Sequence, residues 1–355
     1  MERLQVEELE PNRLMSLAGL KGWLIPVGLI LVLVSNVIAL MLPFLDIDVV
    51  LKGHSEYKLP ESVKLMWEMK LYWVSILIVV FSIVFPLAKT IALIVTWFLK
   101  VPPLLRRRFI LLLESLGKWS MLDIFVVILL MVLSNNQIFL STKPRAGLIF
   151  FIFAIIGNMI MSRIMEVVDG RLYPKVEQEE TEEKDFIPLG STGGIGWAMP
   201  LLLIVSFVSI IVAVDVPFLK INDILLRSHS YSVVEATGAL WTESRYVLAA
   251  FLIFFVGVMP LIRILYIGWI WFNRGSGTLH ERRFDQVRVM GEWSMMSVFL
   301  LALVMILTEG GELVRTQLKN GLWAILASTM VCVISLWIAR FLLRRAILAA
   351  RKQAS

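Results

Sequence analysis

The sequence predicts an all-α polytopic membrane protein made of two parallel copies of one four-helix transmembrane module. Of its 355 residues, 58% are apolar and 17% are charged, and the mean hydropathy is +0.81, whereas soluble domains are about 45–50% apolar and about 25% charged. The apolar residues stand in uninterrupted blocks of about 20, the length that crosses the hydrocarbon core as a helix. The chain also aligns with itself, which indicates a duplication.

Eight segments have the length and composition of a membrane-spanning helix. They are Trp23–Phe44, Leu71–Phe98, Trp119–Leu140, Ala146–Met165, Trp197–Val214, Tyr246–Phe272, Trp293–Leu307 and Gly321–Ala339. The first follows a charged stretch of 22 residues that has no small-residue cleavage site, so we expect it to be kept as an anchor helix.

Lys and Arg are distributed unevenly between the two sets of loops. The loop Lys100–Lys118, the loop Asn273–Glu292 and the basic tail 344–355 lie on the richer side. Because cytoplasmic loops carry the excess of positive charge, both termini are predicted to face the cytoplasm. The net charge of +6 then reflects topology and attraction to anionic headgroups, and we predict no binding of nucleic acid.

A shift of 174 residues aligns the two halves of the sequence without a gap. The matched residues include Trp23 with Trp197, Pro26 with Pro200, Trp67 with Trp241, Pro86 with Pro260, and Trp119-Ser120-Met121 with Trp293-Ser294-Met295. The repeat predicts a first module at 23–165 and a second at 197–343, after a cytoplasmic N-terminus at 1–22. Four helices per module is an even number, so both modules are expected to insert the same way up.

The segments outside the spans have distinct compositions. The linker 166–196 is acidic and then rich in glycine, which is typical of a flexible cytoplasmic tether. The outer loops 45–70 and 215–245 correspond in the repeat, and Phe44–Val49 alternates polar and apolar residues. We therefore expect a small β-rich element on the periplasmic face of each module. The segment 104–116 is predicted to form an interfacial helix.

Charged residues inside a span cost roughly 2.5–3.5 kcal/mol on insertion scales and are functional candidates for that reason. Lys89 and Arg263 are repeat counterparts, and each lies three residues after a proline, Pro86 or Pro260. A proline within a helix distorts it and leaves a backbone carbonyl without its usual donor. Asp123 lies one turn into the third span, and its counterpart is Ser297.

These polar residues allow three interpretations. Lys89 pairs with Asp123 and holds two helices together; or Lys89 and Arg263, with the neighbouring hydroxyls, line a polar cavity that handles an anionic lipid headgroup; or Asp123 takes part in a proton relay. The hydroxyl candidates are Ser120, Ser294 and Ser297. Asn36 and Asn158 are expected to make interhelical hydrogen bonds.

Several classes of chemistry are excluded by what the sequence lacks. Cys332 is the single cysteine and the three histidines are scattered, so neither a disulfide framework nor a cysteine-built zinc site is possible. No nucleophile elbow, metalloprotease helix or nucleotide loop is present. We predict no enzymatic activity, no catalytic residue, no metal and no cofactor.

Two stretches carry a resemblance to a known family. Phe85-Pro86-Leu87-Ala88-Lys89 followed by Gly117–Val127, which the second module repeats more loosely as Met259–Arg263 and Gly291–Phe299, resemble the core of the paraquat-inducible protein A family. The resemblance implies an inner-membrane protein of Gram-negative bacteria with two four-helix modules. It also implies a periplasmic MCE-domain partner that forms a tunnel for phospholipid. Family members often carry a Cys-x-x-Cys zinc ribbon ahead of each module, and this chain has neither.

The sequence-based hypothesis is thus a non-enzymatic, inner-membrane subunit of a phospholipid transport system that supports envelope integrity. It would load or receive phospholipid and dock the MCE-domain protein through loops 45–70 and 215–245. The alternatives are an ion-coupled secondary transporter of a small solute, with Asp123 and Lys89 as the coupling pair, and a membrane scaffold that transports nothing.

Overall fold

The computed structural model of the chain describes residues 14, 22–49, 53–68, 70, 72–134, 140–172, 185–191, 196–222, 228–309 and 316–354. The chain divides into two compact units, Met1–Glu177 and Gln178–Ser355. Within the described residues, eight helical segments are long and apolar enough to cross a membrane. The prediction of an all-α polytopic membrane protein is confirmed.

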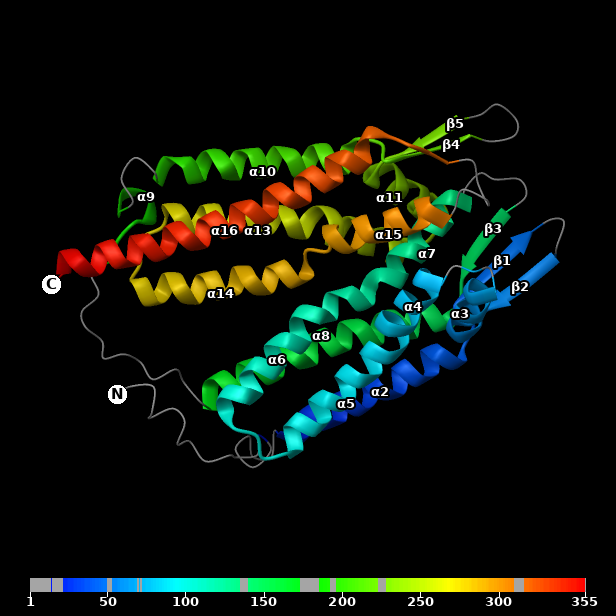
Figure 1. Cartoon of the computed structure of the whole chain (residues 1–355), viewed down its shortest axis with the longest axis horizontal. Coiled ribbons are helices and arrows are strands. Elements are labelled where there is room, and N and C mark those ends of the chain that lie inside the picture. Colours follow the sequence, from blue (N-terminus) through cyan, green and yellow to red (C-terminus); the bar gives the residue numbers. More distant parts are fainter. Residues whose placement is uncertain are drawn as a thin grey trace. The chain divides into compact units, whose positions relative to one another are not determined.

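In the first module, the helices run in an up-and-down order and the strands gather at one end, here called the sheet end (Figure 1). Its elements are α2 (Leu24–Met41), β1 (Leu45–Val49), β2 (Gly53–Tyr57), α3 (Leu59–Glu68), α4 (Tyr72–Ile78), the π-helical turn η2 (Val79–Val84), α5 (Phe85–Phe98), α6 (Pro103–Gly117), the 3-10 turn η3 (Lys118–Met121), α7 (Leu122–Ser134), β3 (Leu140–Pro144) and α8 (Ala146–Leu172).

The second module contains the corresponding elements after the short α9 (Pro188–Ser191). They are α10 (Ala198–Asp215), β4 (Leu219–Asn222), β5 (Ser228–Tyr231), α11 (Val233–Thr242), α12 (Tyr246–Leu252), the π-helical turn η5 (Ile253–Val258), α13 (Met259–Phe272), α14 (Gly277–Trp293), α15 (Met296–Glu309), β6 (Thr316–Leu318) and α16 (Asn320–Ala354). Five of these, α10, α11, α12, η5 and α13, have the bounds of α2, α3, α4, η2 and α5 shifted by 174 residues.

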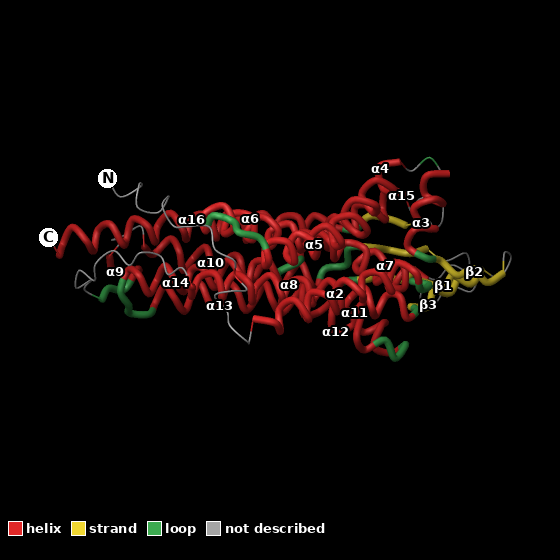
Figure 2. Tube along the Cα trace, turned by 90° about the horizontal axis from the view of Figure 1, so that it is seen from below, coloured by secondary structure: helices red, strands yellow, loops and turns green. Residues whose placement is uncertain are grey.

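The sheet end of each module holds a three-stranded antiparallel sheet. In the first module β1 lies between β2 and β3, and in the second β4 lies between β5 and β6. Figure 2 shows β1, β2 and β3 beyond the end of α7. The outer loops thus contain strands, as expected, but the third strand comes from the connection between the third and fourth spans. Asp46 of β1 is buried and pairs with Arg145, which precedes α8.

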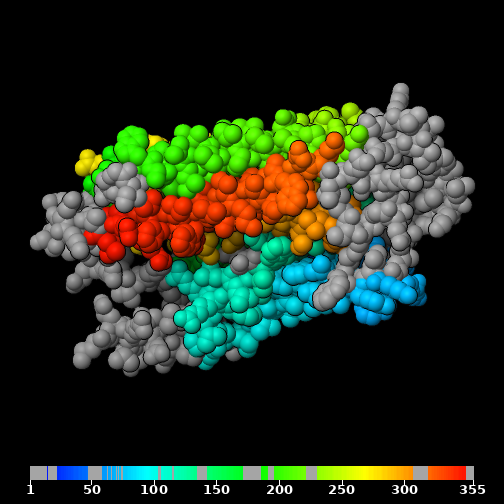
Figure 3. Space-filling model, turned by 45° about the horizontal axis from the view of Figure 1, so that its top comes forward, coloured from blue at the N-terminus to red at the C-terminus, as the bar shows by residue number. Residues whose placement is uncertain are grey.

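The first and last helices of each module pack together along their length, as Figure 3 shows for α10 and α16. Between α2 and α8 the close approach is made by glycines: Cβ atoms at Gly28 and Gly157 would lie 2.8 Å from Met161 Sδ and 2.6 Å from Val32 Cγ2. Between α10 and α16 it is made by serines, with Ser206 Oγ 2.5 Å from Ser335 Oγ. Small residues and hydroxyls are the usual means by which helices associate in lipid.

Two segments, the connection before the seventh span and the end of the fourth span, differ from the sequence-based description. The loop 273–292 contains the 17-residue helix α14, which was missed because its many charged residues give it no apolar stripe. The predicted helix at 104–116 is present as α6, and it packs on α8. Helix α8 continues to Leu172, inside the stretch assigned to the linker. The acidic run 177–184 lies outside the described residues.

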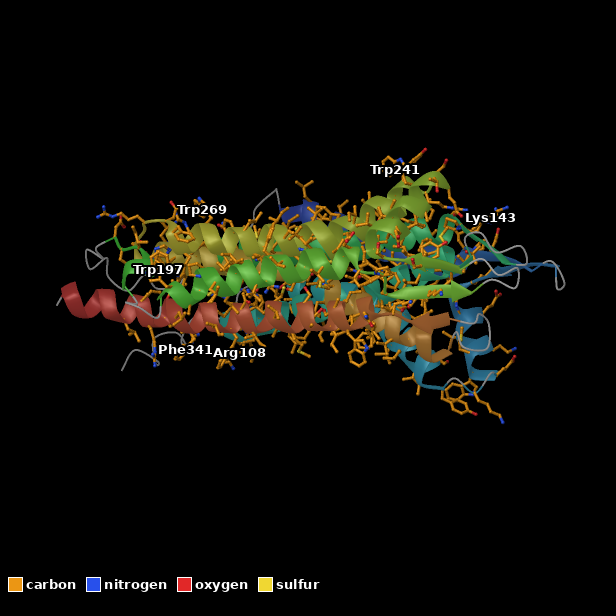
Figure 4. All side chains as sticks on the ribbon, turned by 90° about the horizontal axis from the view of Figure 1, so that it is seen from above. Arg108, Lys143, Trp197, Trp241, Trp269 and Phe341 are labelled. Atoms are coloured by element: carbon orange, nitrogen blue, oxygen red, sulfur yellow. The ribbon has the colours of Figure 1, made fainter. Side chains whose placement is uncertain are left out.

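Exposed aromatic side chains mark the two ends of the second module. Figure 4 shows Trp197 and Trp269 near the end opposite the strands and Trp241 at the sheet end. Trp241 forms an edge-to-face pair with Tyr246, with ring centroids 4.9 Å apart, and Trp67 and Tyr72 form the same pair in the first module at 5.0 Å. Trp and Tyr prefer the membrane–water interface, so these rings indicate the depth of the bilayer.

Candidate functional site

The second span of each module is interrupted by a π-helical turn that ends two residues before the proline predicted to distort it. The Phe85 N–H donates to the Val80 carbonyl, and the Met259 N–H to the Phe254 carbonyl, five residues back in each case. With this five-residue spacing, the carbonyl that follows the one of Val80 or Phe254 would accept a hydrogen bond from the backbone N–H of Pro86 or Pro260. Proline has no backbone N–H, so that bond is not made. π-helical turns of this kind are frequent at functional sites.

A second discontinuity lies opposite, where α6 of the first module and α14 of the second meet the third span. We call residues 117–121 and 291–295, which contain the Trp-Ser-Met sequence, the helix break. In the second module the Met295 N–H donates to the Phe255 carbonyl over 3.0 Å, which satisfies the carbonyl that Pro260 leaves without a donor. The ring centroids of Phe255 and Trp293 are 5.9 Å apart. The π-helical turn and the helix break are therefore joined directly.

The intramembrane cation of each module lies against the glycine that begins the helix break. A Cβ atom built on Gly117 would lie 2.5 Å from Lys89 Nζ, and one on Gly291 would lie 3.0 Å from the Cζ of Arg263. Lys89 is only 2% exposed. Each cation thus lies beside bare backbone, and a Cβ added at the glycine would force the end of the cation's side chain to shift.

The first module surrounds this arrangement with polar side chains. Asp123 and Ser82 of η2 are both buried. The Thr90 hydroxyl lies 2.8 Å from the Pro86 carbonyl oxygen and 2.9 Å from Asn158 Oδ1, so Asn158 does link two helices, as expected for a buried amide. The pairing of Lys89 with Asp123 stays a prediction.

The second module has apolar or uncharged residues at the same repeat positions. Val256, Ile264 and Cys332 replace Ser82, Thr90 and Asn158. Ser297, which replaces Asp123, is half-buried, as are Ser294 and Arg263, whereas Ser120 of the first module is buried. The structure therefore brings the predicted cations to equivalent places but gives them different surroundings.

Sequence reasoning missed three features of the site. Gly117 and Gly291 were visible as matched glycines next to the Trp-Ser-Met sequence, but no pattern shows that a cation rests on them. Ser82 is a common residue in a span and carries no signal by itself. The buried pair of Arg106 with Asp169 links α6 to α8, and its two members are 63 residues apart.

The duplicated module, with its intramembrane cation, π-helical turn and helix break, defines a class of polytopic membrane proteins that is built from two tandem four-helix units. The chain belongs to the paraquat-inducible protein A family, whose sequence profile matches residues 27–168 and 198–346. With its eight apolar helices, it is a multi-pass protein of the bacterial inner membrane.

Three curated proteins similar to the chain are each named intermembrane transport protein PqiA. They come from Escherichia coli strain K12, Escherichia coli O6:H1 and Shigella flexneri. Each is 27% identical to the chain over 127 residues, which is 34% of this chain and 30% of the relative. The matched segment thus spans less than a third of the relatives' length. No solved structure matches the chain.

Proposed function

We propose that the chain is a subunit of an intermembrane phospholipid transport system and that it acts with a periplasmic MCE-domain protein. The observation that carries the proposal is the cation held against glycine within the membrane-spanning part of both modules. A charge kept at that depth is costly, and the phosphate of a lipid headgroup is an abundant membrane anion that such a cation would bind. The name of the relatives, intermembrane transport protein, agrees with this role.

The sheet ends are the proposed docking surfaces for the MCE-domain protein. Each offers a folded surface outside the membrane span, made by β1–β3 with α3 or by β4–β6 with α11. The polar residues near the π-helical turns, among them Lys89 and Arg263, would contact the headgroup. Envelope integrity would depend on the chain through this transport.

The proposal predicts that phospholipid and an MCE-domain protein co-purify with the chain in mild detergent. Lys89→Ala and Arg263→Ala should each reduce phospholipid transfer between inner-membrane and outer-membrane vesicles by about tenfold, the effect of losing one charge-assisted hydrogen bond. Transfer is measured with labelled phospholipid and normalised to the amount of folded chain.

The matched control is Lys100→Ala, which removes a lysine from the end of the same span. Lys100 is exposed, and its loss should leave transfer unchanged. Isolation of the chain without phospholipid or MCE-domain protein under several gentle conditions would contradict the proposal. Unchanged transfer in both site variants would instead favour a scaffold.

An ion-coupled transporter of a small solute is the second candidate, and the burial of Asp123 within the third span favours it. A carboxyl group in that position can bind and release a proton within the span. In that case solute uptake should collapse with the proton gradient and with Asp123→Asn, while Ser82→Ala should have a smaller effect. Phospholipid transfer that persists in Asp123→Asn without a proton gradient would exclude the ion-coupled mechanism.

A further inference from the structure

Four side chains join α13 to α14 near the end of the second module that lies opposite its sheet. The Tyr266 hydroxyl donates to Gln286 Oε1, and the Tyr266 ring is stacked with Trp269, with ring centroids 5.6 Å apart and planes inclined by 16°. The guanidinium carbon of Arg283 stands over the same Trp269 ring, 4.6 Å from its centroid. We call Tyr266, Trp269, Arg283 and Gln286 the stacked cluster. It holds one arginine against the face of an aromatic ring.

Arg283 is restrained from a second side by Gly275, in the turn before α14. A Cβ atom at Gly275 would lie 3.4 Å from Arg283 Nη1. The Gly275 backbone is itself bound, because its N–H donates to the Phe186 carbonyl over 3.1 Å and its carbonyl accepts from the Phe186 N–H over 3.0 Å. Arg283 is half-buried, and among the described residues no carboxylate pairs with it. Stacking and contact thus fix the arginine without neutralising its charge.

The acidic residues of α14 lie away from the stacked cluster. Glu281, Asp285 and Glu292 are two, two and nine residues from Arg283, which places each of them about 160–180° around the helix from it. Gln286 is three residues from Arg283 and lies on the same side. The side of α14 that meets Trp269 therefore presents a positive charge, and the negative charges of this helix are on its opposite side.

The stacked cluster lies at the level of the lipid headgroups. Trp269 is 47% exposed, and Figure 4 shows it, like Trp197, near the end opposite the strands, where exposed tryptophan marks the membrane–water interface. One and two turns closer to the middle of the span, on the same face of α13, Leu265 and Ile262 are exposed. A lipid with its headgroup at Arg283 would therefore have its acyl chains against an apolar surface.

A restrained arginine at this depth is suited to a phosphate group. Arginine stays protonated at physiological pH, and its planar fork matches the oxygens of a phosphate and binds them in pairs. Because Trp269 and Gly275 already restrict the side chain, binding costs less conformational freedom than it would at a mobile arginine. The repeat positions of Trp269 and Arg283 in the first module are Val95 and Phe109, which offer neither the ring nor the charge.

We propose that Arg283, held on the Trp269 ring, binds the phosphate of a phospholipid headgroup at the membrane surface of the second module. The lipid belongs to the leaflet opposite the sheet end, which the charge bias of the loops assigns to the cytoplasm. This surface site is separate from Lys89 and Arg263, the proposed headgroup contacts within the spans of the two modules. Its existence does not rest on the proposed function.

The test uses the full chain, stripped of lipid in detergent and titrated with phosphatidylglycerol while native mass spectrometry follows the number of lipids bound. Arg283→Gln should raise by about tenfold the concentration that fills one of the bound-lipid positions, as expected for the loss of a charge-assisted hydrogen bond, and leave the other positions unchanged. Trp269→Leu, which keeps the charge but removes the ring, should raise it by about threefold. Arg283→Lys, which keeps the charge but loses the fork, should lie between wild type and Arg283→Gln.

The matched control is Arg282→Gln, which makes the same change in net charge at the preceding, exposed residue and should leave the titration unchanged. A loss as large in Arg282→Gln as in Arg283→Gln would mean that general positive charge attracts the lipid, and would overturn the proposal. Identical titrations of wild type and Arg283→Gln would overturn it too. If Arg283→Gln does not fold, as thermal unfolding in detergent would show, Trp269→Leu and Arg283→Lys decide the matter by the same criteria.

Two further ligands separate the phosphate group from its possible sources. Diacylglycerol, which has the same chains but no phosphate, should not fill the position; if it filled the position as readily as phosphatidylglycerol, the apolar surface alone would bind the lipid and Arg283 would have no role. Millimolar inorganic phosphate should compete only weakly, because it lacks the chains that lie against Leu265. If it bound as tightly as phosphatidylglycerol, with the same dependence on Arg283, the site would serve free phosphate and the assignment to lipid would be wrong. Absence of an MCE-domain partner would count against the proposed function and leave these binding results standing.

Discussion

Replacing Arg106 with methionine is expected to lower the free energy of unfolding of the first module by about 3–5 kcal/mol, the range for breaking one side of a buried ion pair. Arg106 Nε donates to Asp169 Oδ1 over 2.7 Å, and Nη2 lies 2.5 Å from the same oxygen. The side chains are 0% and 6% exposed. The substitution leaves a buried carboxylate without its cation, and a lower midpoint of thermal unfolding in detergent would report the loss.

The double variant Arg106→Met/Asp169→Leu is the matched control. It removes both charges, and replacing a whole buried pair with apolar residues of similar size is often neutral, so more than half of the lost stability should return. The second module supports this expectation, because it has His280 and Leu343 at the same repeat positions. A single variant as stable as wild type, or a double variant weaker than the single one, would show that the pair does not hold α6 on α8.

The spans could be predicted from the sequence because each is an apolar block of the required length, and lipid demands that its backbone be helical. The repeat could be predicted because prolines and tryptophans recur at one spacing. Arg106 illustrates a feature that could not be predicted from the sequence. It stands among three consecutive arginines that fit the charge bias of a cytoplasmic loop, and Asp169 lies in a stretch assigned to the linker. Whether these two residues pair depends on how α6 packs on α8, and the local sequence carries no information about that packing.

Some features of the candidate site could likewise be predicted from the sequence, and others could not. Pro86 and Pro260 predicted a distorted second span, and the structure has one, but the π-helical turn lies before the proline and not at it. The partner of a buried charge is also beyond a single sequence. Pairing of Lys89 with Asp123 was one of three interpretations that the sequence left open, and it stays a prediction. Several polar residues in neighbouring spans could equally have been the partner of Asp123, and only the rotation of each helix about its axis decides which of them faces it.

Substituting alanine for Gly321 is expected to destabilise the second module by about 1–3 kcal/mol, the usual effect of overpacking. The added Cβ would lie 2.5 Å from both the carbonyl carbon and the oxygen of Pro217, and backbone atoms cannot move aside as a flexible side chain can. The Gly321 N–H also donates to that oxygen over 2.9 Å, a bond that closes α16 onto the end of α10. Thermal unfolding in detergent measures the effect.

Gly147→Ala is the equivalent test in the first module, since its Cβ would lie 2.7 Å from the Pro43 oxygen. The control is Gly170→Ala on the same helix, α8, where an added Cβ meets nothing within 4 Å. There alanine should be neutral or stabilising by about 0.5–1 kcal/mol, because glycine inside a helix is the less favourable residue. If Gly147→Ala and Gly170→Ala changed stability alike, helix propensity would be the cause. Glycine at position 147 would then not be required by the close approach of the last helix to the end of the first.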